Sequence, residues 1–121
     1  MNNPEKHEEI RRNLANECRR KAESEGFVSL MNDTKWRELC FAFSAFNPPP
    51  AWRSLDLLNG HLSDWDREWF HHVGPEYCSI EWLEIDPGDC DREKVRAVLR
   101  EIGVPFDESE SGNFKVIGYK R

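Results

Sequence analysis

The sequence predicts an α+β fold, in which a small antiparallel sheet is packed on one face by two or three helices. Three observations lead to this prediction. Segments 32–46 and 91–102 place apolar residues at helical spacing. Several shorter segments have the alternation or the bounding turn residues of strands. The expected order is helix, helix, strand, short helix, strand, helix, strand, strand, which is typical of the α+β class.

The length and composition fit one domain with a heavily charged surface. The chain has 121 residues, of which 38% are hydrophobic and 33% are charged. This length leaves no room for a second core of ordinary size. Five Trp and seven Phe form a large aromatic complement. Because each buried aromatic removes a large apolar area from water, a few core positions are enough to hold the fold.

A first helix is expected from Asn3-Pro4 to about Ser24. Asparagine is a good N-cap, proline suits the first helical position, and Gly26 provides a stop. The apolar stripe of this helix is thin and consists of Ile10, Leu14 and Cys18, with Ala15 and Ala22 beside it. A helix with so narrow a stripe docks along one narrow edge or frays. We therefore treat residues 1–26 as a loosely docked N-terminal helix and residues 27–121 as a single α+β domain.

The second helix has a much stronger pattern. Candidate caps at Asn32, Asp33 and Thr34 precede it. Its apolar face follows the spacing i, i+3, i+4, i+7 and consists of Trp36, Leu39, Cys40 and Phe43, extended by Phe46. The prolines at 48–50 end the helix and form a stiff, extended connection.

Short elements are expected in the middle of the chain. Residues 51–57 are compatible with a strand, which the turn Asn59-Gly60 closes. The run Ser63-Asp64-Trp65-Asp66 resembles a capping box with Asp in place of Glu. It predicts about two helical turns that continue through Trp69 and Phe70.

The last third of the chain predicts a strand, a helix and a closing strand. The strongest strand prediction is 77–85, with Ile80 and Trp82 on one face and Leu83 and Ile85 on the other. A turn at 86–89 leads to a helix over 91–102, which Gly103 caps. A polar turn at 109–112 precedes the final strand. The apolar residues of this last helix and strand are Val95, Val98, Leu99, Ile102, Phe114 and Val116.

The charge distribution indicates which partners suit the chain. The net charge is −6, and residues 76–110 alone carry eleven acids and four bases. Nucleic acid is not an expected partner, because a basic surface supplies most of the affinity for phosphate. A basic protein surface is the expected partner. The alternative is that the acids form a solvated face that keeps the protein soluble.

Location and redox state follow from two further observations. No apolar run approaches 18 residues, and the N-terminus lacks the apolar segment of a signal peptide, so we expect a cytoplasmic protein without a membrane partner. The four cysteines, Cys18, Cys40, Cys78 and Cys90, form no CxxC pair. Without export, free thiols are favoured over disulfides.

No pattern of residues predicts catalysis, a metal or another cofactor. The segment 61–78 holds several metal-ligating residue types: His61, His71, His72, Asp64, Asp66, Glu68 and Cys78. It has no HExxH, CxxC or HxH spacing, so chance clustering in a surface loop is favoured over zinc. Glu81 and Glu84 form a close acidic pair, but a regular strand turns them to opposite sides. A nucleophile motif such as GxSxG is absent, and we expect no enzyme.

Two features favour a binding surface. Trp65 and Trp69 stand among acids and are typical interface anchors, although they also suit a role in covering one edge of the sheet. The second feature is an acidic series near the turn that follows the strongest strand. Its candidate contact residues are Glu81, Glu84, Asp86, Asp89 and Asp91, continued by Glu93, Asp107, Glu108 and Glu110. Such a series attracts a cationic surface and speeds association.

Three segments carry a family resemblance: LMNDTKWREL at 30–39, SIEWLEI at 79–85, and residues 103–119. Together they resemble a family of small bacterial proteins known only as a domain of unknown function. The resemblance covers roughly residues 27–119 and implies no activity.

In size and charge the chain is also similar to immunity proteins, which neutralise a cognate toxin by plugging its active site. The leading hypothesis is therefore an immunity protein that binds a basic toxin domain. A regulatory or housekeeping interaction module without a toxin is the first alternative, and an enzyme is the second. Oligomeric state and strand order are not predicted.

Overall fold

The computed structural model describes residues 4–74 and 76–121. Its elements follow in chain order: α1 (Pro4–Glu25), β1 (Val28–Ser29), α2 (Asp33–Ser44), β2 (Ala51–Asp56), the 3-10 turn η1 (Tyr77–Ser79), β3 (Ile80–Asp86), α3 (Arg92–Ile102), β4 (Phe106–Glu108), β5 (Phe114–Ile117) and β6 (Tyr119–Lys120). The expected N-cap at Asn3 lies outside the described residues. None of the helices in the described part of the chain combines the length and apolar character needed to cross a lipid bilayer.

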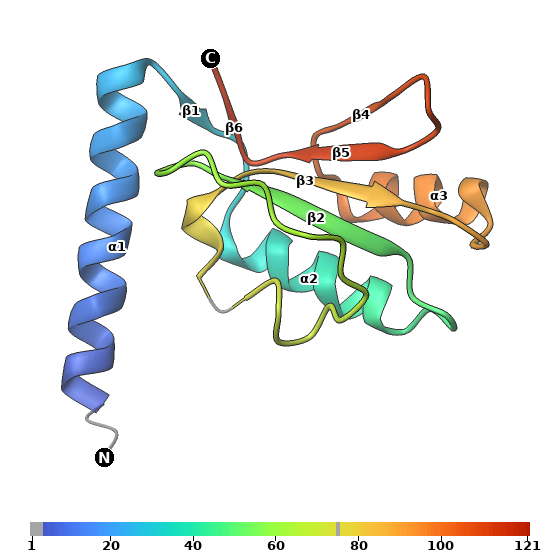
Figure 1. Cartoon of the computed structure of the whole chain (residues 1–121), viewed down its shortest axis with the longest axis horizontal. Coiled ribbons are helices and arrows are strands. Elements are labelled where there is room, and N and C mark those ends of the chain that lie inside the picture. The colour runs from blue at the N-terminus through green and yellow to red at the C-terminus, as the bar shows by residue number, and fades with distance from the viewer. Residues whose placement is uncertain (1–3, 75) are drawn as a thin grey trace.

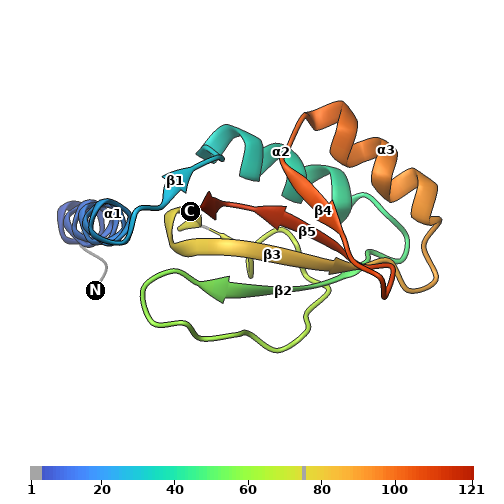
Figure 2. The same cartoon turned by 90° about the horizontal axis from the view of Figure 1, so that it is seen from above.

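Four strands form an antiparallel sheet in the order β2-β3-β5-β4, and β1 pairs with β6 in a separate two-stranded sheet. Helices α2 and α3 lie together on one side of the four-stranded sheet (Figure 1). Helix α1 stands at one end of the molecule, beside β1 and η1 (Figures 1 and 2). The predicted α+β class and the one-sided packing of helices on the sheet are confirmed.

Helix α2 forms where its spacing predicts it. The side chain of Asn32 accepts a hydrogen bond from the Lys35 amide at 2.8 Å and so caps the first turn. The residues of α2 that are buried are the four that the spacing predicts: Trp36, Leu39, Cys40 and Phe43. Lys35 Nζ donates to the Ile102 carbonyl, which ties α2 to the end of α3.

Helix α3 also matches its prediction. The Asp91 side chain accepts a hydrogen bond from the Glu93 amide at 2.9 Å, and Gly103 ends the helix with a φ of 81°. Val95 and Leu99 are the buried residues of this helix, while Val98 and Ile102 are partly buried against the same core.

The strand register decides which face of the sheet meets the helices. Leu83 is paired with Ser54 and Val116, and Ile85 is paired with Trp52 and Phe114. Leu83, Ile85, Phe114 and Val116 are fully buried and join the residues of α2 and α3 in one core. The core therefore lies between the helices and this face of the sheet.

A β-bulge corrects the prediction for the start of β3. The pairing with β2 shifts between Leu55 and Asp56, whose partners are Trp82 and Ile80, so Glu81 is the extra residue. The bulge changes the alternation of side chains. Ile80 therefore belongs to the core with Leu83, whereas Trp82 is half-exposed and was wrongly predicted to share the face of Ile80.

The short helix predicted after residue 63 does not form. Residues 61–66 instead run along the outer edge of β2, with backbone hydrogen bonds between Trp52 and Asp66 of 2.8 and 2.9 Å. Acidic side chains then accept hydrogen bonds from backbone N–H groups that would donate to backbone carbonyls in a helix. Asp66 accepts from the Glu68 amide, and the Glu68 carboxylate accepts from the amides of residues 70–72. The segment is thus an extended stretch joined to β2 by two isolated β-bridges, Leu55–Leu62 and Trp52–Asp66, and followed by a loop.

Helix α1 touches the rest of the molecule near its C-terminal half. Cys18 and Ala22 are its buried residues, whereas Ile10 is 57% exposed. Arg11 forms an ion pair with Glu76 at 3.2 Å, with its side chain largely in solvent. The narrow contact follows the thin apolar stripe of the sequence. Loose docking of α1 remains a prediction.

Candidate functional site

The face of the four-stranded sheet that is turned away from α2 and α3 is called the open face here. Its residues alternate with the core residues along β2, β3 and β5. Glu84 lies between Arg53 and Lys115, and Trp82 lies between Leu55 and Ile117. All six side chains are neither fully buried nor fully exposed. No helix in the described ranges 4–74 and 76–121 covers this face (Figure 1).

Two tryptophans lie on the open face, each under a cation. Trp65 comes from the edge segment, is 42% exposed, and has the Arg53 guanidinium 4.6 Å from its ring centroid. Trp82 comes from β3 and has Lys115 Nζ 4.1 Å from its ring centroid. Such cation–π contacts hold the rings in place while leaving ring surface available to a partner.

Glu84 organises the charges of the open face. Its carboxylate accepts a hydrogen bond from Arg53 Nε at 2.8 Å and another from Asn113 Nδ2 at 3.0 Å. Partial burial acts to raise the pKa of Glu84, but the hydrogen bonds from Asn113 and Arg53 and the charge of Lys115 outweigh it, so the pKa is lowered. Glu84 is therefore a fixed negative charge at neutral pH.

A group of acids lies at the end of the molecule where β3 leads into α3 and β4 turns into β5. Arg92 Nε donates to the Gly112 carbonyl at 3.0 Å and so holds the start of α3 against the β4–β5 turn. This group is called the acidic end and consists of Asp86, Asp89, Asp91, Glu93, Glu108 and Glu110. Asp86 follows Glu84 on the same side of β3, so the acidic end adjoins the open face.

Part of the acidic charge is neutralised locally. Arg96 pairs with both Glu93 and Glu108, and Arg92 Nη2 lies 3.7 Å from Glu108. Asp86 and Asp91 accept hydrogen bonds from backbone amides of the turn and of α3, which leaves their charge in place. Asp89 and Glu110 are exposed. The acidic end therefore keeps an excess of negative charge directed to solvent.

Six of the seven predicted contact residues, all except Trp69, lie in three places. Trp65 and Glu84 are on the open face, and Asp86, Asp89 and Asp91 are at the acidic end. Glu81 lies in the bulge at the opposite end of β3, about 16 Å from Asp86 at the rise of an extended strand. The structure therefore places five of these residues in two adjoining regions and leaves Glu81 apart.

Trp69 was predicted to contact a partner, but it lies in the core. It is 1% exposed, its ring packs 5.0 Å from that of Phe43, and its Nε1 donates to the Pro50 carbonyl at 2.9 Å. A side chain so enclosed has no surface for a partner. The alternative role, in which Trp69 belongs to the packing at the edge of the sheet, describes it better.

Three residues of the open face were missed as contact candidates: Arg53, Trp82 and Lys115. The position of Lys115 between Phe114 and Val116 signals a strand residue that faces away from the core. The same reasoning fails for Trp82, because the bulge at Glu81 reverses the alternation before it. The sequence around Arg53 does not indicate a contact residue, because the position of its side chain depends on the pairing with Glu84 on the neighbouring strand.

The histidine-rich segment was predicted not to bind metal. His72 Nδ1 lies 2.7 Å from Asp66 Oδ2, and His71 Nδ1 lies 3.4 Å from Glu68 Oε1. Among the residues that the structure describes, no group of three or more His, Cys, Asp or Glu side chains is arranged to hold a metal ion. The carboxylates of Asp66 and Glu68 are already engaged with backbone amides of the loop.

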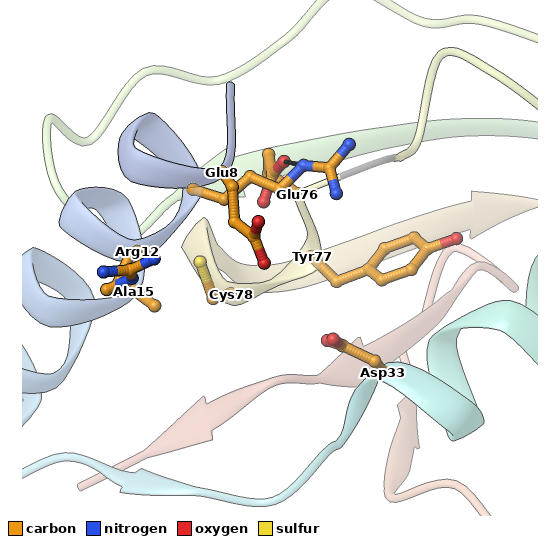
Figure 3. A pocket seen from close by; sticks show the side chains of 8 residues that line it. Glu8, Arg12, Ala15, Asp33, Glu76, Tyr77 and Cys78 are labelled. Carbon is orange, nitrogen blue, oxygen red and sulfur yellow. Dashed lines mark ion pairs between the residues drawn. The ribbon is translucent and has the colours of Figure 1, made fainter. Parts of the chain in front are cut away.

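A groove of about 370 Å³ separates α1 from η1 and the start of α2. Glu8 and two arginines from α1 face Asp33, Glu76 and Tyr77 across it, and Cys78 lies between the two sides (Figure 3). The charges are mixed, with Arg11 paired to Glu76. This groove is separate from the open face.

Comparisons with known proteins locate the chain in one family. No curated protein and no solved structure matches it. A family model described as a family of unknown function, DUF6678, matches residues 18–121, which include every strand, α2, α3 and the last turns of α1. The chain belongs to this family of unknown function, DUF6678.

Proposed function

We propose that this protein acts by binding, and that it is an immunity protein which neutralises a bacterial toxin by docking on a basic surface of the toxin. The observation that carries the proposal is the continuity between the open face, with Trp65 and Trp82, and the acidic end that begins at Asp86. Aromatic anchors are enriched at the core of specific protein interfaces, and complementary charge beside them steers association.

The two regions have different roles in this proposal. The acidic end attracts a cationic partner over several ångströms of solution and so raises the association rate. The tryptophans then supply the apolar area that keeps the complex together. Toxins that act on nucleic acids or nucleotides often present a basic cleft, which would fit such a surface.

The state of Glu84 supports binding over catalysis. General acid–base work at neutral pH requires a group whose pKa lies near 7. The pKa of Glu84 is shifted the opposite way, because Asn113 and Arg53 donate hydrogen bonds to its carboxylate against the effect of burial. Fixed charges of this kind orient a partner rather than transfer protons.

Partner capture tests the proposal. The tagged chain would be used to capture partners from its own organism and from competing strains, at low and high salt, with mass spectrometry of the eluate. We expect one basic protein at near-equal amounts, bound less tightly at high salt. The purified pair should then show loss of the partner's toxic activity at one-to-one stoichiometry.

Charge reversal locates the surface. Asp89→Lys with Glu110→Lys should slow association at low salt at least about tenfold, and Trp65→Ala should weaken the complex by about tenfold or more. The matched control is Glu23→Lys with Glu101→Lys, which makes the same charge change at exposed positions of α1 and of the far end of α3.

Equal effects of the two double variants would show that only net charge matters and would remove the acidic end from the interface. Weak capture of several unrelated partners, without inhibition of any, would favour the regulatory or housekeeping interaction module instead.

A further inference from the structure

Two cysteines that are 60 residues apart in the sequence meet where α1 joins the rest of the molecule. The Sγ atoms of Cys18 on α1 and Cys78 in η1 lie 3.6 Å apart. A disulfide has an S–S distance of about 2.05 Å, so the two sulfurs need to approach by about 1.6 Å to form one. Both cysteines are free thiols in the structure.

The other two cysteines have different surroundings. Cys40 is 5% exposed and belongs to the core face of α2. Cys90 lies in the turn before α3, where its Sγ donates to the Pro48 carbonyl at 3.3 Å. The thiol–thiol contact is therefore a particular feature of Cys18 and Cys78.

We propose that Cys18 and Cys78 form a redox modification site, at which a low-molecular-weight disulfide of the glutathione class oxidises the pair to an intramolecular disulfide. This inference is independent of the proposed binding function. It assigns a covalent link between α1 and the sheet domain, and glutathione disulfide is the oxidant used to test it.

The reaction balances in two exchange steps. The Cys78 thiolate attacks one sulfur of glutathione disulfide, which forms a mixed disulfide and releases one glutathione. The Cys18 thiolate then attacks Cys78 Sγ and releases the second glutathione. Two protein thiols lose two protons and two electrons in total, and one glutathione disulfide gains them to become two molecules of glutathione.

The order of the steps follows from access. Cys18 is 1% exposed and cannot meet an oxidant in solution directly. Cys78 is half-buried and lines the groove between α1 and η1 (Figure 3). Arg11 and Arg12 line the same groove together with Glu8, Asp33 and Glu76, and Arg11 is paired with Glu76. Cys78 is thus the entry point and Cys18 the resolving thiol.

The surroundings make the exchange slow at neutral pH. Burial raises the pKa of Cys18 to about 12, with further contributions from the contact with Cys78 and from the charges of Asp56 and Glu17. Burial also raises the pKa of Cys78. The hydrogen bond from Cys18 acts to lower this pKa, whereas the negative charges of Glu76 and Asp33 raise it further. Since the thiolate is the nucleophile, the rate should increase about tenfold per pH unit below these pKa values.

The test uses the full-length reduced protein, incubated with glutathione disulfide at several pH values. Thiols that remain are trapped with iodoacetamide, followed by intact mass measurement and non-reducing peptide mapping. We expect the oxidised chain to lack the two carbamidomethyl groups that Cys18 and Cys78 carry in the reduced, alkylated chain, with a single cross-linked peptide pair that contains both cysteines, and full reversal by dithiothreitol. The oxidised protein should unfold at a temperature about 10 °C higher, since the link closes a long loop.

Single variants separate the two roles. Cys18→Ser should stop at a mixed disulfide with glutathione on Cys78, and Cys78→Ser should leave Cys18 unreacted in the folded chain. Wild-type peptide mapping alone decides the matter if either variant fails to fold. A stable mixed disulfide on wild-type Cys78 without a cross-link would overturn the proposal. Cross-links spread over other cysteine pairs, or no reaction when urea-unfolded chain reacts, would overturn it equally.

Discussion

Two adjacent aromatic residues after β2 have opposite environments. Trp69 is 1% exposed and packs against Phe43 and Trp52, with ring centroid distances of 5.0 and 6.1 Å. Phe70 is 63% exposed. In the sequence the two look alike, because the pattern shows only that both are large and apolar. The fold separates them by turning the chain from the sheet edge into the core at Trp69.

This contrast gives a first prediction. Trp69→Ala should lower the free energy of unfolding by about 3–5 kcal/mol, because it leaves a cavity and removes the hydrogen bond to the Pro50 carbonyl. Phe70→Ala should change it by less than about 0.5 kcal/mol. Urea unfolding followed by fluorescence or circular dichroism measures both. Equal losses for the two variants would show that the core does not include Trp69.

Glu84 gives a second prediction, on pH. Burial acts to raise the pKa of Glu84, but the hydrogen bonds from Asn113 and Arg53 outweigh this effect, so the pKa is lowered in the folded state. The folded chain then binds fewer protons than the unfolded chain in the range between the two pKa values. The stability that the Glu84 carboxylate contributes is therefore complete above the pKa of about 4.3 that a glutamate has in the unfolded chain. It is lost as the pH falls through the lower pKa of Glu84 in the folded chain.

Glu84→Gln should accordingly lower the free energy of unfolding by about 1–2 kcal/mol at pH 7. The difference from wild type should shrink as the pH falls below about 4. Urea titrations across this pH range measure it, with Glu110→Gln in the exposed β4–β5 turn as the control. A difference that stays constant with pH would mean that the carboxylate charge is not what stabilises.

At the scale of elements, Asp91 has two roles that substitution can separate. Its side chain caps α3 by accepting from the Glu93 amide at 2.9 Å, and its charge belongs to the acidic end. Asp91→Ala should cost about 1 kcal/mol of stability, whereas Asp91→Asn should cost much less, because asparagine caps equally well. Thermal unfolding tests this.

Partner binding extends the same prediction. If the charge of Asp91 contributes to the interface, Asp91→Asn should weaken binding at low salt as much as Asp91→Ala does, despite its intact stability. Binding that follows stability instead would assign Asp91 to the helix cap alone.

The elements that the sequence predicts are those whose signal is local. Helices α2 and α3 each have an N-cap, an apolar stripe and a stop signal within one segment of sequence. The apolar stripe of α2 correctly predicts its buried residues. The strand pair β1–β6 was not predicted, because two residues on each side have no pattern of their own.

The errors arise where a distant contact overrides a local signal. Trp65 and Trp69 have helical spacing, but the backbone of 61–66 finds hydrogen-bond partners along β2 instead. The bulge at Glu81 likewise depends on how β3 pairs with β2, and it moves Trp82 from the predicted face to the open face. The acidic part of the site was predictable from charge alone; its continuity with the tryptophans was not.

At the scale of the whole molecule, α1 and the sheet domain are joined by a narrow contact. The buried residues of α1 lie at Cys18 and Ala22, toward its C-terminal end. Deletion of residues 1–13 should therefore change the unfolding temperature by only a few degrees, since residues 5–13 are exposed and the deletion removes the largely exposed Arg11–Glu76 ion pair.

Hydrogen exchange provides the independent measurement for α1. In the intact protein, amides of the first turns should exchange faster than those near Cys18, because short helices without packing are marginal in water. A large loss of stability on deletion, or uniform protection along α1, would show that the helix is docked along its whole length.

The two edges of the four-stranded sheet have a consequence for solubility at high concentration. Strand edges with unpaired backbone groups invite pairing between molecules, which leads to aggregation. Here the segment 61–66 occupies the outer side of β2 with its own backbone hydrogen bonds. The opposite edge, β4, has only three residues and carries Asp107 and Glu108. One edge is covered and the other is short, so the four-stranded sheet resists growth into strand-paired polymers even when the protein is abundant.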